Sequence, residues 1–362
     1  MRSDTDTDKG TDMSLDLSAD VRALTARLVD IESVSGDEKA IVDAIEEALR
    51  PLGHLSVDRD GEALVARTAL GRAERVVIAG HVDTVPVAGN LPSRVEGDLI
   101  YGCGTSDMKC AVAVMLKLCL LEAPNRDLTF VFYDCEEIEA ERSGLLRLTR
   151  NHPDWLAGDF AVLMEPTHGL IEGGCQGTLR AEIVTHGVRA HSARSWQGAN
   201  AVHAAAPILD LLNAYEPRRP VVEGLEYREG LNAVGIRGGV AGNVIPDECV
   251  VTVNYRFAPD LSVDQAKDHV RDVFADFEVR FTDAAPAARP GLTHPVAARF
   301  AEAVGGVPRA KYGWTDVARF SELGIPAVNY GPGDPNVAHR RDEHAELSKI
   351  VECERRMTAW LS

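Results

Sequence analysis

Histidine and acidic side chains follow three short apolar segments of the sequence. They are, in chain order, the pair His81 and Asp83, the pair Glu136 and Glu137, and Glu165. Open α/β sheets place binding and catalytic residues beyond the carboxyl ends of their strands, so we expect these side chains to meet at one sheet edge. Each residue alone has an ordinary explanation, such as a helix cap or a surface histidine. Only the residues taken together indicate a functional site.

Two further candidates lie elsewhere in the chain. Asp107 belongs to the segment GCGTSDMK at 102–109, at the expected start of a helix, and His339 precedes the last expected helix. The glycine spacing of 102–109 does not match G-x-G-x-x-G, which argues against a dinucleotide-binding loop. Two imidazoles and three carboxylates suit divalent zinc. The predicted metal ligands are His81, Asp107, Glu137, Glu165 and His339.

These ligands would balance the charge of two zinc ions. If Asp107 bridges the ions, each ion receives one histidine and one glutamate, and a shared water completes the site. Two Zn²⁺ ions supply +4, which three carboxylates and a bridging hydroxide cancel. Asp83 is then available to hold the other ring nitrogen of His81. Glu136 is available as a general base.

The elements around these residues alternate in type over the first 170 residues. Short apolar runs at 75–79, 128–133 and 160–164 read as strands, and helical patterns lie at 21–49 and 108–121. Continuous apolar strands that alternate with helices indicate an α/β layer with a buried, largely parallel sheet.

The middle of the chain follows another pattern. Segments 178–185 and 250–257 alternate apolar and polar residues, as half-solvated strands do, and helices are expected at 199–213 and 263–274. These elements suit a small α+β domain. Residues 282–290 have the composition of a linker, and α/β character returns after them. We therefore predict a tail at 1–18, an α/β catalytic domain at 19–175 and 287–362 with a mixed, largely parallel sheet, and an inserted α+β domain at 176–286.

Charge and composition exclude several functions. The net charge of −18 argues against sequence-independent binding to nucleic acid or to an anionic membrane surface. The longest apolar run is too short to span a bilayer, and the first twenty residues lack the layout of a signal peptide. Seven scattered cysteines without a C-x-x-C pair indicate reduced thiols. We expect a cytoplasmic protein.

The motifs resemble a known family. The order G-H-x-D, G-x-G-T-x-D-M-K, Glu-Glu, E-P-T and a late histidine is similar to the co-catalytic dizinc peptidases and deacylases of the M20 type. Finer segments, such as GCQGTLR at 174–180, RAHSARSW at 189–196 and GGVAGNVIP at 238–246, resemble the actinobacterial branch that acts on N-succinyl-LL-2,6-diaminopimelate. The resemblance covers nearly the whole chain from about residue 20.

The resemblance implies roles for the ligand set. His81 and Glu165 would hold one zinc ion, Glu137 and His339 the other, and Asp107 would bridge them, with cobalt possible at either site. Glu136 would take the proton of the bridging water and pass it to the leaving amine.

The resemblance also assigns residues of the inserted domain. That domain would act as a lid and carry the interface of a homodimer. His191 would reach the active site of the partner subunit and donate to the oxyanion, and Asn243 would help to bind substrate.

An anionic substrate requires cations, for which arginine is the usual choice. The candidates are Arg256, Arg319, Arg180 and Arg194, with the first two favoured by their contexts. Gln176 departs from the pattern, because some relatives carry arginine there, so carboxylate recognition can differ. The implied reaction is amide hydrolysis to succinate and LL-2,6-diaminopimelate. The alternatives are a related deacylase, such as one acting on acetylornithine, a carboxypeptidase, or a non-catalytic binding homologue.

Overall fold

The computed structural model describes residues 14–362. The chain divides into two compact units. The first unit contains the chain up to Ile171 together with Arg299–Gly306 and Asn329–Ser362, and the second contains Glu172–Ala298 and Val307–Val328. The second unit therefore includes the predicted inserted domain and extends beyond it on both sides. The predicted boundary at 175/176 remains a prediction.

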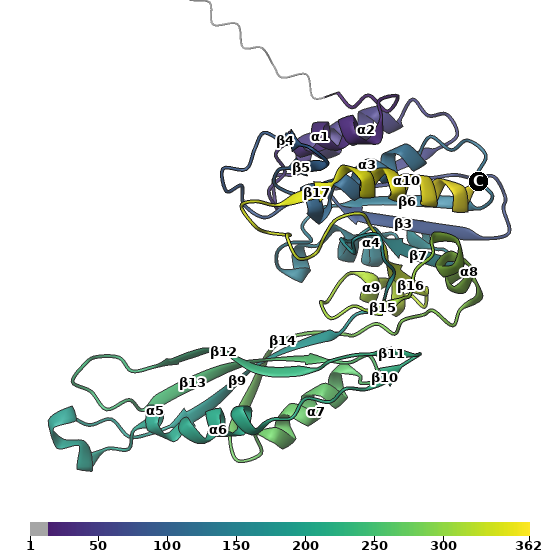
Figure 1. Ribbon diagram of the computed structural model, residues 1–362. Helices are drawn as coiled ribbons and strands as arrows, with labels where there is room; N and C mark the ends of the chain where they lie inside the picture. Colours follow the sequence, from purple (N-terminus) through teal and green to yellow (C-terminus); the bar gives the residue numbers. More distant parts are fainter. Residues whose placement is uncertain (1–13) are drawn as a thin grey trace, which may run out of the picture. The chain divides into compact units, whose positions relative to one another are not determined.

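A mixed sheet forms the centre of the first unit (Figure 1). Its strands are β1 (Ser56–Asp60), β2 (Ala63–Arg67), β6 (Asp127–Tyr133), β3 (Arg75–His81) and β7 (Phe160–Leu163), in that spatial order. Strand β3 runs parallel to both β6 and β7, whereas β2 pairs antiparallel with β6 and with β1. Residues of the second unit form β8 (Glu172–Gly173) and β15 (Arg309–Ala310), which pair in parallel, and most of β16 (Ala327–Asn329). The predicted largely parallel sheet is confirmed.

Apolar strands and helices explain this core. Strands β3 and β6 are almost entirely apolar and buried, as expected of strands covered on both faces. The helices are α1 (Val21–Val29), α2 (Lys39–Leu49), α3 (Cys110–Leu118), α4 (Gly144–Asn151), α8 (Pro295–Val304) and α10 (Leu347–Leu361). All of α3 except Lys117 is buried. Its approach to β3 depends on Gly80, where a Cβ atom would lie 2.6 Å from Met108 Cε and 3.0 Å from Met115 Sδ.

The second unit is built on a four-stranded antiparallel sheet. Its order is β12 (Gly230–Gly238), β13 (Glu248–Phe257), β9 (Gly177–His186) and β14 (Glu278–Ala285). Alternate residues of β9 and β13, including Leu179 and Tyr255, point into a core that also takes residues from α5 (Ala201–Ala204), α6 (Ala206–Ala214) and α7 (Val263–Val273). A capping box between Ser262 and Gln265 begins α7. This arrangement confirms the predicted α+β character.

Smaller elements complete the two units. In the first, β4 (Arg94–Glu96), β5 (Leu99–Tyr101) and β17 (His344–Glu346) form a three-stranded sheet. In the second, β10 (Val221–Val222) pairs with β11 (Leu225–Glu226), and α9 (Val317–Glu322) is a short helix. The described residues contain no helix that is long and apolar enough to cross a membrane.

Several sequence predictions need correction. The helical pattern at 21–49 is interrupted, and α1 and α2 are separate helices. The expected linker at 282–290 is wrong at its beginning, because residues 282–285 belong to β14, which pairs antiparallel with β9. Leu15 and Leu17 were included in the predicted tail, yet both are buried, and Lys117 Nζ donates to the carbonyl of Leu17 at 2.8 Å. The tail prediction for residues 1–13 lies outside the described residues.

Candidate metal centre

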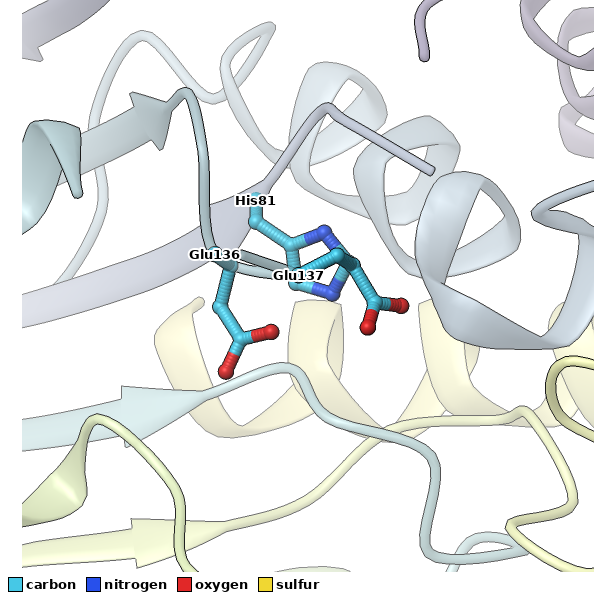
Figure 2. Close-up of side chains that lie close together, drawn as sticks. All are labelled: His81, Glu136 and Glu137. Carbon is cyan, nitrogen blue, oxygen red and sulfur yellow. The ribbon is translucent and has the colours of Figure 1, made fainter. Parts of the chain in front are cut away.

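The carboxyl ends of two parallel strands bring the first group of candidates together. His81 is the last residue of β3 and pairs in register with Tyr133, the last residue of β6. Glu136 and Glu137 follow β6, so the pairing carries them to the same sheet edge as His81. One ligand atom of each of these three residues lies within 4.8 Å of the others, and Figure 2 shows the two carboxylates beside the imidazole.

A second group shares Glu137 with the first. Asp107, Glu137 and His339 also bring their ligand atoms within 4.8 Å of one another. His339 Nε2 lies 2.7 Å from Glu137 Oε1. Asp107 directs Oδ1 to His81 Nε2 at 3.0 Å and Oδ2 to His339 Nε2 at 3.4 Å. Two oxygens of one carboxylate that face two separate imidazoles are what a carboxylate between two cations requires, so the donor set fits a pair of metal ions.

Asp83 contacts both the glutamate pair and the histidine of the first group. Its side chain is fully buried, and Oδ1 and Oδ2 accept hydrogen bonds from the backbone N–H groups of Glu136 and Glu137 at 3.0 and 3.1 Å. Ser35 donates its hydroxyl to Oδ2 at 2.7 Å. Asp83 Oδ1 also lies 3.4 Å from His81 Nδ1, and the Asp83 carbonyl oxygen lies 3.0 Å from the same nitrogen. A proton on Nδ1 satisfies these acceptors and leaves the Nε2 lone pair for a metal ion.

The carboxylates shift the ionisation of the two imidazoles. Hydrogen bonds to Asp107 and Glu137 raise the pKa of His339 to about 10. Burial disfavours the charged form of His81, but hydrogen bonds to Asp107 and Asp83 raise its pKa well above the usual value. Burial opposes ionisation of Asp107, yet its bonds to the two histidines hold its pKa below the usual range. The cluster thus attracts positive charge, and divalent cations compete with protons for such ligands.

Glu165 occupies a different position from the other predicted ligands. Its side chain is buried, and neither of the two groups found among residues 14–362 includes it. Its assignment as a ligand therefore remains a prediction.

Sequence reasoning missed the buried residues that support this centre. Glu343 accepts hydrogen bonds from backbone N–H groups around Asp107, and Glu38 accepts them from Gly36 and Cys135. Burial raises the pKa of Glu343 to about 7. Lys109 donates to the carbonyl of Ile31 at 2.6 Å, and burial lowers its pKa to about 8. Lys109 stands in the segment 102–109, but nothing in the sequence distinguishes Glu343 and Glu38 from surface acids.

The remaining candidates lie in the second unit. His191 and Asn243 are exposed on neighbouring segments, where the Ser192 N–H donates to the Asn243 carbonyl at 2.9 Å. His191 Nδ1 accepts a hydrogen bond from the Ala193 N–H at 3.1 Å. A neutral ring that accepts at Nδ1 carries its proton on Nε2, so this imidazole can donate.

The four candidate arginines differ in their surroundings, and Arg194 is exposed in the short helical segment Ser192–Gln197. Arg180 on β9 and Arg256 on β13 lie on the same sheet face, since Arg256 pairs with Thr178, two residues from Arg180. Burial and the charge of Arg180 lower the pKa of Arg256, whereas Asp283 and Cys175 oppose that shift. Arg319 is buried, bonds Asp316 at 2.6 Å and lies over the Trp314 ring. Arg180 and Arg256 therefore offer the stronger attraction for an anion.

Comparison with known proteins settles the family. The model of peptidase family M20/M25/M40 matches residues 77–362. This chain belongs to that family. It is 56% identical over 341 residues to a Mycobacterium tuberculosis protein provisionally named succinyl-diaminopimelate desuccinylase DapE, covering 93% of this chain and 96% of that protein.

Two further similarities extend the comparison. Identity to the succinyl-diaminopimelate desuccinylase of Corynebacterium glutamicum is 48% over 360 residues, covering 96% of this chain and 98% of the other. The crystal structure of Bacillus subtilis YXEP, described as a dinuclear metal-binding peptidase of the M20 family, matches with a TM-score of 0.69 at 18% identity, covering 94% of this chain and 96% of that one. This likeness supports the fold. As a member of the family, the chain is a metal-dependent amidohydrolase.

Proposed function

We propose that this enzyme hydrolyses N-succinyl-LL-2,6-diaminopimelate to succinate and LL-2,6-diaminopimelate, a step of diaminopimelate and lysine biosynthesis. The observation that carries the proposal is the identity of 56% and 48%, over nearly the full length of both chains, to proteins named for this reaction. The arrangement of His81, Asp107, Glu137 and His339 supports it, because amide hydrolysis at neutral pH benefits from a metal-bound water.

The proposed centre contains two zinc ions, with cobalt as an alternative at either site. His81 and Glu165 would hold one ion, Glu137 and His339 would hold the other, and Asp107 would be shared between them. The separate directions of the two Asp107 oxygens support the bridging role. Bound zinc would polarise the amide carbonyl and lower the pKa of water.

Glu136 is the proposed general base. It lies among the ligand atoms of His81 and Glu137, within 4.8 Å, and its backbone N–H is fixed by Asp83. A carboxylate in this position can take a proton from the attacking water and return it to the departing amine nitrogen.

Two arginines are proposed to bind the carboxylates of the substrate. Arg256 and Arg180 share a sheet face, and burial together with the nearby charge of Arg180 lowers the pKa of Arg256. A bound carboxylate would oppose that shift. Arg319 is a weaker candidate, since Asp316 already engages its guanidinium group. Gln176 is buried and donates to the Arg228 carbonyl at 2.7 Å, so it cannot replace an arginine charge.

We assign His191 and Asn243 to the active site of the partner subunit in a homodimer. Apolar side chains exposed on the second unit support an interface there. They include Val234 and Ile236 on β12, an outer strand of its sheet, and Leu209 and Leu211 on α6. Exposed apolar groups beside an outer strand are typical of an interface between copies.

We place the enzyme in the cytoplasm. All seven cysteines of the chain fall in the described residues, and each is buried with a free thiol. Free thiols are expected in a reducing compartment.

A comparison of substrates tests the proposed reaction. The zinc-loaded enzyme is incubated with N-succinyl-LL-2,6-diaminopimelate and, separately, with N-acetylornithine, and release of the amine is followed over time. The proposal predicts a higher kcat/KM for the succinyl substrate. Faster turnover of N-acetylornithine would instead identify a related deacylase, and turnover of neither substrate would leave a carboxypeptidase or a binding homologue.

A further inference from the structure

The buried carboxylate of Glu343 contacts the backbone of the loop that carries Asp107, the proposed bridging ligand. Glu343 is 1% exposed, and its two oxygens accept three backbone hydrogen bonds. Oε1 accepts from Ser106 N at 2.8 Å and from Asp107 N at 3.1 Å, and Oε2 accepts from Gly104 N at 3.1 Å. One side chain thus orients three of the four peptide N–H groups from Gly104 to Asp107.

The same segment also carries a proposed metal ligand. Glu343 lies four residues after His339, and its own carbonyl accepts from Gly102 N at 3.1 Å. Nearby, Ser106 donates its hydroxyl to the carbonyl of Asp334 at 2.9 Å. The segment 334–343, which carries His339, is therefore hydrogen-bonded at both of its ends to the loop that carries Asp107.

We infer that Glu343 is a positioning residue that sets the spacing between Asp107 and His339, and through it the affinity of the centre for metal ions. The inference rests on the proposed two-ion centre. The hydrogen bonds of the Glu343 carboxylate go to backbone N–H groups, so it acts through the backbone of the Asp107 loop. Partners that orient the ligands of a metal site typically change its affinity about 10- to 100-fold when removed.

The chemistry of the carboxylate explains why glutamine is an informative replacement. Glu343→Gln keeps the size of the side chain but replaces one acceptor oxygen with an N–H donor. Whichever way the amide lies, at least one of the three N–H groups then faces a donor. Glu343→Asp keeps two acceptor oxygens on a shorter side chain, and it should recover part of the effect.

Asp127 provides a matched control in the same unit. It is also buried, and it accepts hydrogen bonds from Leu70 N at 2.7 Å, Arg72 N at 2.8 Å and Thr68 Oγ1 at 2.9 Å. It lies at the start of β6, whereas Glu136 and Glu137 follow the end of that strand. Asp127→Asn should therefore lower stability without changing metal binding.

The test measures metal binding without substrate. Co²⁺ is titrated into metal-free wild-type protein and the Glu343→Gln, Glu343→Asp and Asp127→Asn variants, and the visible absorption of bound Co²⁺ is recorded together with thermal unfolding of each metal-free protein. We expect two Co²⁺ per wild-type chain. We also expect affinity about 10- to 100-fold weaker and an altered spectrum in Glu343→Gln, with an intermediate Glu343→Asp and a wild-type affinity for Asp127→Asn.

The possible failures are distinguishable. Wild-type affinity and spectrum in Glu343→Gln, with reduced thermal stability, would overturn the positioning role and leave Glu343 a structural residue. Equal loss of metal affinity in Asp127→Asn would also overturn it, because general destabilisation would then explain the effect. A wild-type protein that binds fewer than two Co²⁺ ions would contradict the proposed centre itself.

Discussion

The two units support their candidate residues in opposite ways. In the first unit, buried carboxylates fix the backbone under the functional side chains: Asp83 holds Glu136 and Glu137, and Glu343 holds Asp107. In the second unit, the imidazole of His191 is exposed and accepts a hydrogen bond from the nearby Ala193 N–H. Backbone contacts within one unit thus hold the ligands of the proposed metal centre in place, whereas the role proposed for His191 requires a partner subunit.

The largest expected effect tests the preformed region. Glu136→Gln should lower kcat by about 10²- to 10⁴-fold, because the amide cannot accept the proton of the attacking water. Metal content, measured by elemental analysis, should stay at two ions per chain. Glu139 is an exposed neighbour of Glu136, and as a control Glu139→Gln should leave kcat unchanged. Retained activity in Glu136→Gln would remove this residue as the base.

The next effect tests the second unit. His191→Ala should lower kcat by about 10²- to 10³-fold through loss of a donor to the oxyanion, with metal content unchanged. Mixing Glu136→Gln and His191→Ala subunits under exchange conditions should restore about one quarter of wild-type activity, because half the dimers are mixed and each mixed dimer has one intact site. No recovery in dimers shown to have mixed would place His191 outside the partner's site.

A smaller effect tests whether Arg256 binds the substrate or is an ordinary surface cation. Arg256→Met should raise KM for the succinyl substrate about 10- to 100-fold, as expected for loss of a charge-assisted hydrogen bond to a carboxylate. The effect on kcat should be smaller. Arg237→Met is a suitable control, since Arg237 on β12 already pairs with Glu182 on β9, two strands away in the same sheet. Equal KM values for the two variants would contradict the assignment of Arg256.

The smallest effect concerns stability of the second unit. Burial lowers the pKa of His269, whose Nε2 lies 2.8 Å from the Tyr215 hydroxyl. The unfolded chain therefore binds a proton at this site more readily, so stability should fall as the pH falls through the unfolded value near 6.5. Urea unfolding at pH 8 and pH 5.5 should show a smaller loss in His269→Phe than in the wild type. An equal loss in both proteins would exclude His269 as a cause.

The sequence predicted the residues of the candidate site better than the strands and buried side chains that position them. Apolar runs revealed β3, β6 and β7, and the positions of His81, Glu136 and Glu137 after two of those strands placed them at one sheet edge. Strands β1, β2, β12 and β14 were not foreseen, because they are short, polar or exposed and their pairing is decided by neighbours. Glu343 was missed because its role depends on contacts with a loop more than two hundred residues away.

Anomalous diffraction from crystals of the zinc-loaded enzyme tests the central claim most directly. The account predicts two zinc peaks, about 3.5–4 Å apart as in other two-metal sites, on either side of the Asp107 carboxylate. His81 should coordinate one ion, and His339 with Glu137 the other. A single peak, or two peaks that do not share Asp107, would contradict the two-ion centre.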